Sequence, residues 1–252
     1  MQGIILAKMR AVIVSDLHSN LAALRAVLDD AAREGCDELW CLGDLVGYGP
    51  QPNECVALMQ AKAARCLAGN HDLAVLGAVP LDDFNTYAAA ANRWTAGVLE
   101  EEARAYLAGL APREEFAGVT LAHGSPREPV WEYVVSPSIA SASFAAFAGN
   151  VCFVGHSHLP LVCREPPYGT PPQLLAGRAG QRVALTGRCI VNPGSVGQPR
   201  DGDPRAAYAI YQDAPAPAIE FRRVAYDVAA TQALMRQANL PAYLIERLAL
   251  GR

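Results

Sequence analysis

Short apolar runs alternate with amphipathic segments along the first third of the chain. Met9 to Ser15 is a β-branched apolar run, typical of a strand that is buried on both faces. Residues 21–34 then repeat apolar side chains at helical spacing, between an N-cap at Ser19 or Asn20 and a stop at Gly35. The pattern therefore predicts a strand followed by a helix.

The same alternation continues to residue 72. We expect a strand at Glu38 to Leu42, a helix at Pro52 to Ala61, a strand at Ala64 to Leu67 and a loop at Gly69 to Asp72. Strands and helices in this order predict parallel pairing with right-handed crossovers.

The rest of the chain mixes helical and strand patterns. Residues 82–110 are rich in alanine and predict a helical cover over the sheet, whereas residues 165–180 are rich in proline and glycine and predict an exposed loop. Further strands are expected at 119–122, 151–154, 189–191, 207–211 and 219–224, and closing helices at 229–238 and 242–248. Because turns between strands are frequent here, we expect a second, mixed sheet, and the fold class is α/β.

Composition favours one folded unit. The 252 residues are 52% hydrophobic and 18% charged, which suits one large core. We expect a single domain at residues 9–252, preceded at 1–8 by a disordered extension or a misassigned start. The apolar patch in residues 1–8 is too short for a signal segment or a membrane span, so no membrane partner is expected.

Charge and cysteine content narrow the partners and the compartment. The formal net charge is -4, without a long run of Lys or Arg, which argues against bulk nucleic-acid binding but leaves a single nucleotide as a suitable ligand. The seven cysteines form no C-x-x-C pair. They indicate buried, reduced thiols in a cytoplasmic protein, with a disulfide framework as the alternative.

All five histidines lie at the end of a predicted strand or in the loop after it, and we expect none inside a helix. A lone histidine is usually a satisfied surface or core residue. Five of them at strand ends should converge on the sheet edge where α/β proteins bind ligands. These histidines are His18, His71, His123, His156 and His158.

The polar residues at these strand ends have metal-binding chemistry. Imidazole nitrogen and carboxylate oxygen suit Mn, Fe, Co, Ni and Zn, and the absence of nearby cysteine argues against a closed structural zinc site. Side chains alternate along a strand, so Asp16-x-His18 and His156-x-His158 should each send two ligands to one side of an extended segment. We therefore expect catalytic metals with open positions.

In chain order the motifs are Asp16-Leu17-His18, Gly43-Asp44, Gly69-Asn70-His71-Asp72, His123-Gly124 and Gly155-His156-Ser157-His158. The series resembles the calcineurin-like metallophosphoesterase superfamily, whose pattern is D-x-H, G-D, G-N-H, a lone H and G-H-x-H. The resemblance runs in order over residues 16–158, and the general organisation extends over nearly the whole chain. It implies a four-layer α/β/β/α sandwich of two mixed sheets flanked by helices.

The resemblance also implies two divalent metal ions (Mn, Fe, Ni or Zn, with Mn favoured for activity) and a hydroxide nucleophile that bridges them. His71 would be the general acid; the alternative is that it only hydrogen-bonds and orients its loop. One ion would take Asp16, His18 and His158, the other Asn70, His123 and His156, and Asp44 would bridge the two.

Two further segments are candidates for substrate contacts. In the N-P-G-S element that begins at Asn192, Ser195 and backbone N–H groups would hold a phosphate oxygen, and Arg200 or Arg205 would pair with a second anionic group. Tyr48 would place its ring over a base or sugar. The alternatives are a structural turn for the first segment and a packed loop residue for Tyr48.

The segment after Asp44 departs from one branch of the superfamily. Protein phosphatases and diadenosine tetraphosphatases read G-D-x-V-D-R-G, in which the second Asp orients the catalytic His and the Arg grips phosphate. Here Gly47 and Tyr48 follow Val46, so protein phosphatase activity is disfavoured and His71 lacks its usual partner. The chain looks more like the small bacterial and archaeal phosphodiesterase-type members, the YfcE-like branch.

We therefore expect a hydrolase that acts on a small phosphorylated substrate, foremost a phosphodiesterase. The alternatives are a phosphomonoesterase or nucleotidase with the same centre, and a non-catalytic scaffold of the same fold. Known scaffolds of this type have lost metal ligands, whereas this chain retains the full set. A homo-oligomer is compatible with the sequence.

Overall fold

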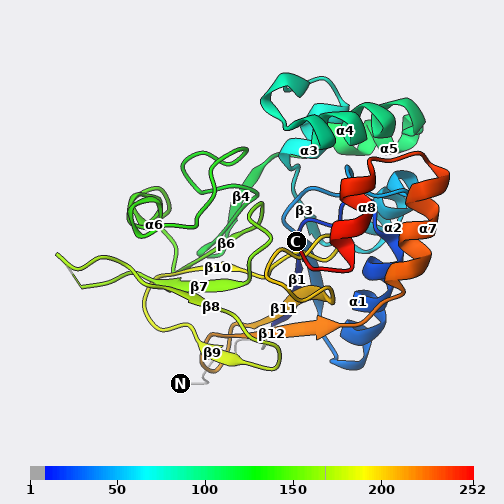
Figure 1. Ribbon diagram of the computed structural model, residues 1–252. Coiled ribbons are helices and arrows are strands. Elements are labelled where there is room, and N and C mark those ends of the chain that lie inside the picture. Colours follow the sequence, from blue (N-terminus) through cyan, green and yellow to red (C-terminus); the bar gives the residue numbers. More distant parts are fainter. Residues whose placement is uncertain (1–8, 168) are drawn as a thin grey trace.

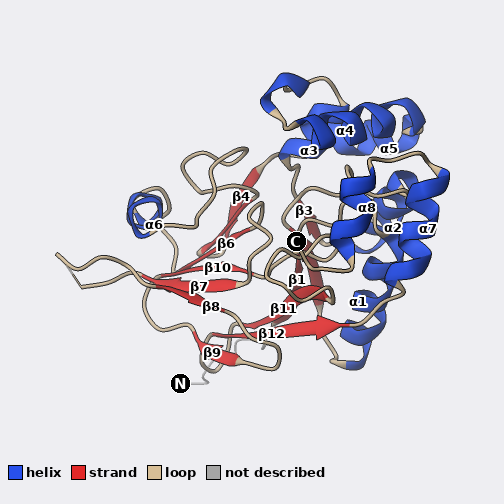
Figure 2. Cartoon of the chain, viewed as in Figure 1, coloured by secondary structure: helices blue, strands red, loops and turns tan. Residues whose placement is uncertain are grey.

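The computed structural model describes residues 9–167 and 169–252. Two six-stranded sheets pack face to face with helices outside them, which confirms the expected α/β/β/α sandwich (Figures 1 and 2). The extension expected at residues 1–8 lies outside the described residues. Within the described part, no helix has the length and apolar character needed to cross a bilayer.

The first sheet joins strands from both ends of the chain. Its order is β3 (Arg65–Cys66), β2 (Glu38–Cys41), β1 (Arg10–Val14), β11 (Ala206–Gln212), β12 (Ala218–Val224) and β9 (Arg182–Ala184). The first three strands are parallel, as predicted, and the others pair antiparallel. We expected β11 and β12 in the second sheet. That prediction is wrong, because β11 is buried along its whole length and fills the place beside β1.

The second sheet comes from the middle of the chain. Its order is β4 (Arg113–Phe116), β5 (Val119–Ala122), β6 (Val151–Val154), β10 (Cys189–Asn192), β7 (Leu161–Arg164) and β8 (Leu174–Ala176). Strands β5, β6 and β10 are parallel, and the sheet is mixed as expected. The loop predicted at 165–180 contains β8, whose two leucines extend the sheet edge beside β7. Strands β4, β7 and β9 were not predicted.

An apolar core lies between the two sheets. Ile13 and Trp40 from the first sheet meet Leu121 and Phe153 from the second, and all four are fully buried. The Trp40 ring lies 6.1 Å from the Phe153 ring and 6.0 Å from that of Tyr211, measured between centroids. Burial of such large side chains is the main force that holds the sheets together.

Helices cover the outer faces of both sheets (Figure 2). On the first sheet lie α1 (Leu21–Arg33), α2 (Pro52–Lys62) and α5 (Glu101–Ala108). The Asn20 side chain caps α1 by accepting from the Ala23 N–H at 3.2 Å, so the predicted start of this helix is confirmed. The second sheet is covered by α6 (Pro137–Phe144), which the pattern did not predict.

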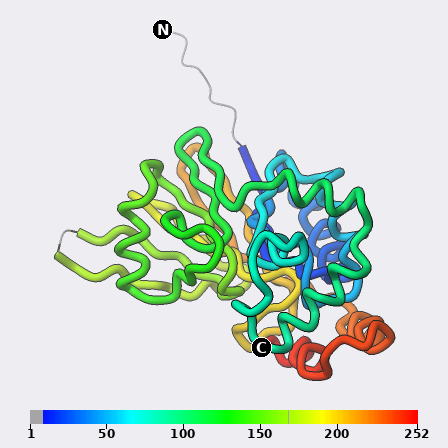
Figure 3. The backbone as a smooth tube through the Cα atoms, turned by 90° about the horizontal axis from the view of Figure 1, so that it is seen from above, coloured from blue at the N-terminus to red at the C-terminus, as the bar shows by residue number. Residues whose placement is uncertain are grey.

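The region expected to be helical at 82–110 holds three elements: a short 3-10 turn η1 (Leu81–Asp83), then α4 (Thr86–Val98) and α5. The closing helices α7 (Val228–Gln237) and α8 (Ala242–Leu248) form where predicted. They pack with α4 in one apolar cluster that also holds Tyr48. Seen from above, the C-terminal helices lie beside the half of the molecule that holds the N-terminal strands and helices (Figure 3).

All seven cysteines are free, and five of them are buried. Six of them lie in strands or helices, and Cys36 lies in the turn between α1 and β2.

Candidate functional site

The predicted metal ligands gather at one edge of the sandwich. The parallel strands of each sheet carry ligands at their carboxyl ends, which is where α/β sheets form ligand sites. All seven side chains are buried, with at most 3% of their surface exposed. They follow β1, β2, β3, β5 and β6 in turn: Asp16 and His18, Asp44, Asn70, His123, and finally His156 and His158.

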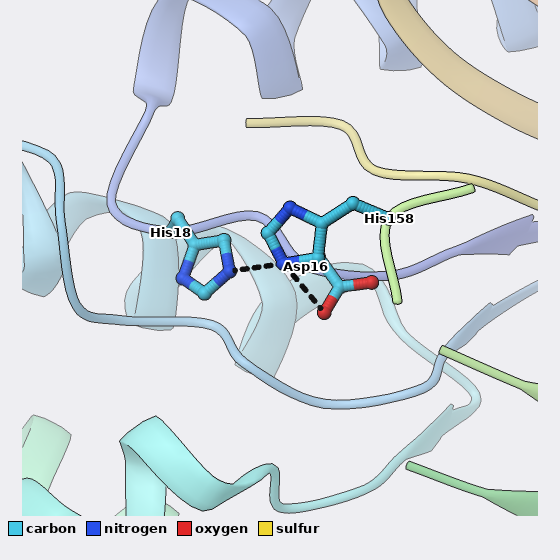
Figure 4. A group of neighbouring side chains, drawn as sticks. All are labelled: Asp16, His18 and His158. Carbon is cyan, nitrogen blue, oxygen red and sulfur yellow. Dashed lines mark hydrogen bonds and ion pairs between the residues drawn. The ribbon is translucent and has the colours of Figure 1, made fainter. Parts of the chain in front are cut away.

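Their ligand atoms form three overlapping groups, in each of which all atoms lie within 4.8 Å of one another. The groups are Asp16, His18 and His158; Asp44, His123 and His156; and His18, Asp44 and His71. In the first group, His158 Nε2 lies 3.1 Å from His18 Nε2 and 3.5 Å from Asp16 Oδ1 (Figure 4). Asp16 and His18 come from the loop after β1 and His158 from the loop after β6, so two loops far apart in sequence converge on one point.

Asp44 belongs to the second group and reaches the first through His18. Its Oδ2 is 3.7 Å from His18 Nε2 and 3.4 Å from His123 Nε2. His123 Nε2 is also 3.1 Å from Asn70 Oδ1. This is the position that a carboxylate shared by two metal ions would occupy.

The histidine rings are oriented as metal ligands. His18, His123 and His158 each direct Nδ1 at a backbone carbonyl, at 3.1, 2.9 and 2.5 Å. A carbonyl only accepts, so Nδ1 carries a hydrogen and Nε2 is the nitrogen that faces the site. Within the described residues, the buried Asp16 Oδ2 has no hydrogen-bond partner. Acceptors that face one another in this way fit cations, and the groups are consistent with a dinuclear metal site.

Burial and mutual charge set the protonation of these groups. Burial lowers the pKa of His18 and His158 well below the usual range, so both rings are neutral and able to bind metal. Burial alone would raise the pKa of Asp44, but His123 and the other imidazoles hold it well below its usual range. Burial would lower the pKa of His123, but Asp44 raises it to about 9. Without metal, a proton on His123 balances the Asp44 carboxylate.

The backbone at the paired ligands is left-handed, not extended. Asp16 and His18 have φ of 54° and 48°, and His156 and His158 have φ of 63° and 61°. The expectation that each pair lies along an extended segment is therefore wrong. Strands β1 and β6 end before these residues, so no ladder holds the chain straight and it turns sharply into the site. Such strain costs about 1–3 kcal/mol for each residue.

The segment expected as a loop at 69–72 begins a helix, α3 (Asn70–Val75), with Gly69 as its N-cap. A Cβ on Gly69 would lie 2.0 Å from Asp44 Oδ1, so glycine allows the helix to start against that carboxylate. The Asp72 carboxylate accepts from the Gly69 N–H at 2.8 Å and from two N–H groups after β2. The expectation that no histidine lies inside a helix is wrong for His71, because α3 is too short to show a periodic pattern.

His71 has a partner that the sequence analysis missed. Its Nδ1 lies 2.8 Å from Asn92 Oδ1, and Asn92 belongs to α4. The signal was a single asparagine among alanines in a helical segment, on the face that proves to be buried. His71 also lines a cavity of about 150 Å³ together with Asp44, Asn70 and His156.

Two of the predicted substrate residues line this cavity. Arg200 reaches the Gln198 Oε1 at 3.0 Å and the Tyr48 hydroxyl at 3.4 Å through Nη2. Tyr48 is only 6% exposed, and its ring packs against those of His18 and His71, 4.6 and 4.4 Å away between centroids. Its ring is therefore packed, which was the alternative to a stacking role.

Asn192 and Ser195 are used inside the protein. Asn192 Nδ2 donates to the Gly155 carbonyl at 2.6 Å, and Ser195 Oγ donates to the Asp16 carbonyl at 2.8 Å. Ser195 Oγ also accepts from the Gln198 N–H at 2.8 Å. Both side chains are buried and neither lines the cavity. The geometry corresponds to the structural turn, not to the expected phosphate contact, because their hydrogen-bonding groups are already occupied.

Three aromatic side chains at the cavity had no motif to reveal them. Phe84, Trp131 and Tyr133 line it from loops. Tyr133 is 43% exposed and stacks on His156 with the centroids 3.9 Å apart, and the Phe84 and Trp131 rings are 5.0 Å apart. They give the mouth of the cavity an apolar wall.

Comparison with known proteins agrees with this geometry. Residues 9–213 match the calcineurin-like phosphoesterase superfamily domain. The chain belongs to this superfamily. The crystal structure of a metallophosphoesterase from Sphaerobacter thermophilus is 47% identical and superposes with a TM-score of 0.88, covering 97% of this chain and 100% of that one. The protein is thus a metallophosphoesterase with buried histidine and aspartate groups at its metal site.

Two archaeal proteins are also similar to this phosphoesterase. An uncharacterized protein from Methanocaldococcus jannaschii is 40% identical over 98% of this chain and 100% of its own length. A hypothetical protein from Pyrococcus horikoshii is 19% identical, with a TM-score of 0.76 over 97% of this chain and 99% of that one, which shows a shared fold.

Proposed function

We propose that this metallophosphoesterase is a dinuclear-metal phosphodiesterase that cleaves a small diester with organic groups on both sides of the phosphate. The observation that carries this proposal is the charge of the cavity. Among the residues that line it, Arg200 is the one arginine or lysine, and Asp83 adds a carboxylate outside the metal-ligand groups. A diester carries one negative charge, whereas a monoester approaches two near neutral pH. Two metal ions would face the phosphate of either ester alike, so the protein's own charge makes the distinction, and its one cation matches the single charge of the diester.

The apolar wall supports the same choice. A diester has a second organic group that must lie beside the reacting phosphorus. Phe84, Trp131 and Tyr133 offer ring surface for such a group, and a nucleoside or another aryl group would suit them. A phosphomonoester or mononucleotide, the second candidate, would leave the single arginine facing a dianion.

The residues of the site then take distinct roles. The seven predicted ligands would hold two divalent ions, with manganese favoured; two such ions lower the pKa of water and polarise phosphoryl oxygens when bound. Arg200 would donate to a non-bridging phosphoryl oxygen. His71 would give a proton from Nε2 to the leaving oxygen. The free thiols support a cytoplasmic location for this chemistry.

The test uses metal-stripped protein titrated with Mn, with bis-p-nitrophenyl phosphate and p-nitrophenyl phosphate as substrates. We expect metal-dependent turnover that is faster for the diester. Arg200→Gln should lower kcat/KM for the diester about ten- to a hundredfold, because a charge-assisted hydrogen bond is lost. Arg205→Gln is the matched control, since Arg205 is already paired with Asp203 at 2.6 Å, and it should leave the rate unchanged.

Each alternative has its own result. Faster turnover of p-nitrophenyl phosphate and of mononucleotides would replace the diesterase with the monoesterase or nucleotidase. Hydrolysis at the same rate before and after chelation of the metal would contradict the metal-dependent mechanism. Metal binding without turnover of any ester would point to the scaffold.

A further inference from the structure

His71 needs a partner that this chain does not supply at the usual place. In the G-D-x-V-D-R-G branch, the aspartate directly after the valine orients the catalytic histidine. Here Gly47 follows Val46 instead. The only other carboxylate in the same helix turn, Asp72, is occupied by three backbone N–H groups. Asp44 also lies near the ring, but its Oδ1 accepts the backbone N–H of His71 and it forms no hydrogen bond with the ring itself, so another group orients the ring.

Asn92 lies in contact with His71. The distance between His71 Nδ1 and Asn92 Oδ1 is 2.8 Å, which is a normal hydrogen bond. Asn92 is fully buried and His71 is 3% exposed, so water does not compete for this contact. Within the described residues, Asn92 Nδ2 has no hydrogen-bond partner. The asparagine is thus buried at some cost, and its one polar contact is the histidine ring.

Gly47 makes room for this pair. A Cβ at Gly47 would lie 2.5 Å from His71 Nδ1 and 2.9 Å from Asn92 Oδ1, and its φ of +87° disfavours any side chain. The histidine and the asparagine therefore fill the space into which a side chain at position 47 would project. The absence of an aspartate at position 47 and the presence of Asn92 beside His71 are therefore two parts of the same local packing.

We propose that Asn92 is the positioning residue for His71. It accepts the Nδ1 hydrogen through Oδ1, which fixes the ring and leaves Nε2 for the cavity that His71 lines. This inference rests on the proposed function, in which the His71 ring enters the step protonated on both nitrogens, gives its Nε2 proton to the leaving oxygen and is left neutral with the Nδ1 hydrogen still donated to Asn92.

A neutral amide suits this site. Asp16, Asp44 and Asp72 already place three carboxylates in the buried region, and a fourth beside His71 would add unfavourable desolvation. Helix α4 holds Asn92 rigidly, because it packs against α3 on one side and shares an apolar cluster with α7 and α8. The amide therefore orients the ring without adding charge.

The test compares two diesters that differ in their need for a proton. p-Nitrophenolate leaves without protonation, whereas phenolate from diphenyl phosphate leaves poorly unless an acid helps. Asn92→Ala should lower kcat for diphenyl phosphate about tenfold or more and for bis-p-nitrophenyl phosphate about threefold or less, with little change in KM. Asn92→Asp keeps an accepting oxygen and should restore the wild-type ratio of the two rates, while the added buried carboxylate lowers the free energy of unfolding.

The matched control is Thr95→Val. Thr95 lies on the same helix and is also fully buried, and within the described residues its hydroxyl has no hydrogen-bond partner. The substitution should leave both rates and the ratio unchanged. An equal loss on both diesters in Asn92→Ala would overturn the proposal, because a merely structural defect affects both alike.

A second readout does not depend on turnover. In metal-free protein, the nitrogen NMR signals of the His71 ring should show hydrogen on Nδ1, and Asn92→Ala should change that pattern. An unchanged His71 pattern would contradict the role of Asn92. If wild-type protein cleaves no ester, the proposed function fails, while the ring signals still decide whether Asn92 sets the tautomer.

Discussion

The core between the sheets and the ligand edge are equally buried but are built in opposite ways. In the core, apolar side chains such as Phe153 and Ile219 are fully buried on regular strands. At the edge, buried histidines and carboxylates lie on left-handed backbone after the strands have ended. Burial stabilises the first region and costs free energy in the second. The core therefore stabilises the fold, and the rest of the fold keeps the ligand edge in its conformation.

The largest expected difference is in activity at the edge. His156→Ala should lower diester turnover at least about a thousandfold, or roughly 4 kcal/mol, because a predicted ligand of one metal ion is lost. Burial lowers the pKa of His156 to about 3, so the ring is neutral and its removal leaves no unpaired buried charge. The free energy of unfolding of metal-free protein, from urea titration, should change by no more than about 1 kcal/mol. A large loss of stability would show that the edge supports the fold.

The next effect is in the core. Ile219→Ala should lower the free energy of unfolding by roughly 2–4 kcal/mol, because it leaves a cavity between the sheets. Ile219 lies on β12, which carries no predicted ligand, so the rate for each folded molecule should stay the same. Urea unfolding and the diester assay on the same sample check both statements. Loss of activity without loss of stability would contradict the separation of the two regions.

The smallest expected effect concerns left-handed backbone that lies away from the candidate site. It compares the strain in such a turn with the strain at the candidate ligands. Ala117 has a φ of 45° in the exposed turn between β4 and β5, at the end of β5 opposite His123. Ala117→Gly should raise the free energy of unfolding by about 0.5–1 kcal/mol, because glycine adopts this conformation without a steric penalty. Turnover should not change. Thermal or urea unfolding that is unaltered would mean that the turn carries no strain.

The sequence predicted that the seven candidate ligands converge, and it predicted part of the architecture. The convergence could be predicted because Asp16, His18 and their counterparts follow strands in a fixed order, and the carboxyl ends of parallel strands meet. The assignment of β11 to the first sheet could not, because a run of apolar residues does not say which partner it pairs with.

Geometry within the site was harder to predict. The left-handed backbone at His156 and His158 comes from packing between loops, and alternation along a strand suggested the opposite. Asn92 was missed because it is distant from His71 in sequence and belongs to a helix that looked like a plain cover. Contacts between a loop and a remote helix leave no periodic pattern in either segment.

Helix α8 has a consequence for how the site is sealed. Its Leu248 lies with Met235 and Tyr48 around a small void behind His18. The apolar cluster at this place keeps bulk water from the rear of the metal ligands, while the substrate side stays open. Proteolytic cleavage before α8 would therefore let water reach the rear of the site and would abolish activity, although every candidate ligand would remain in the chain.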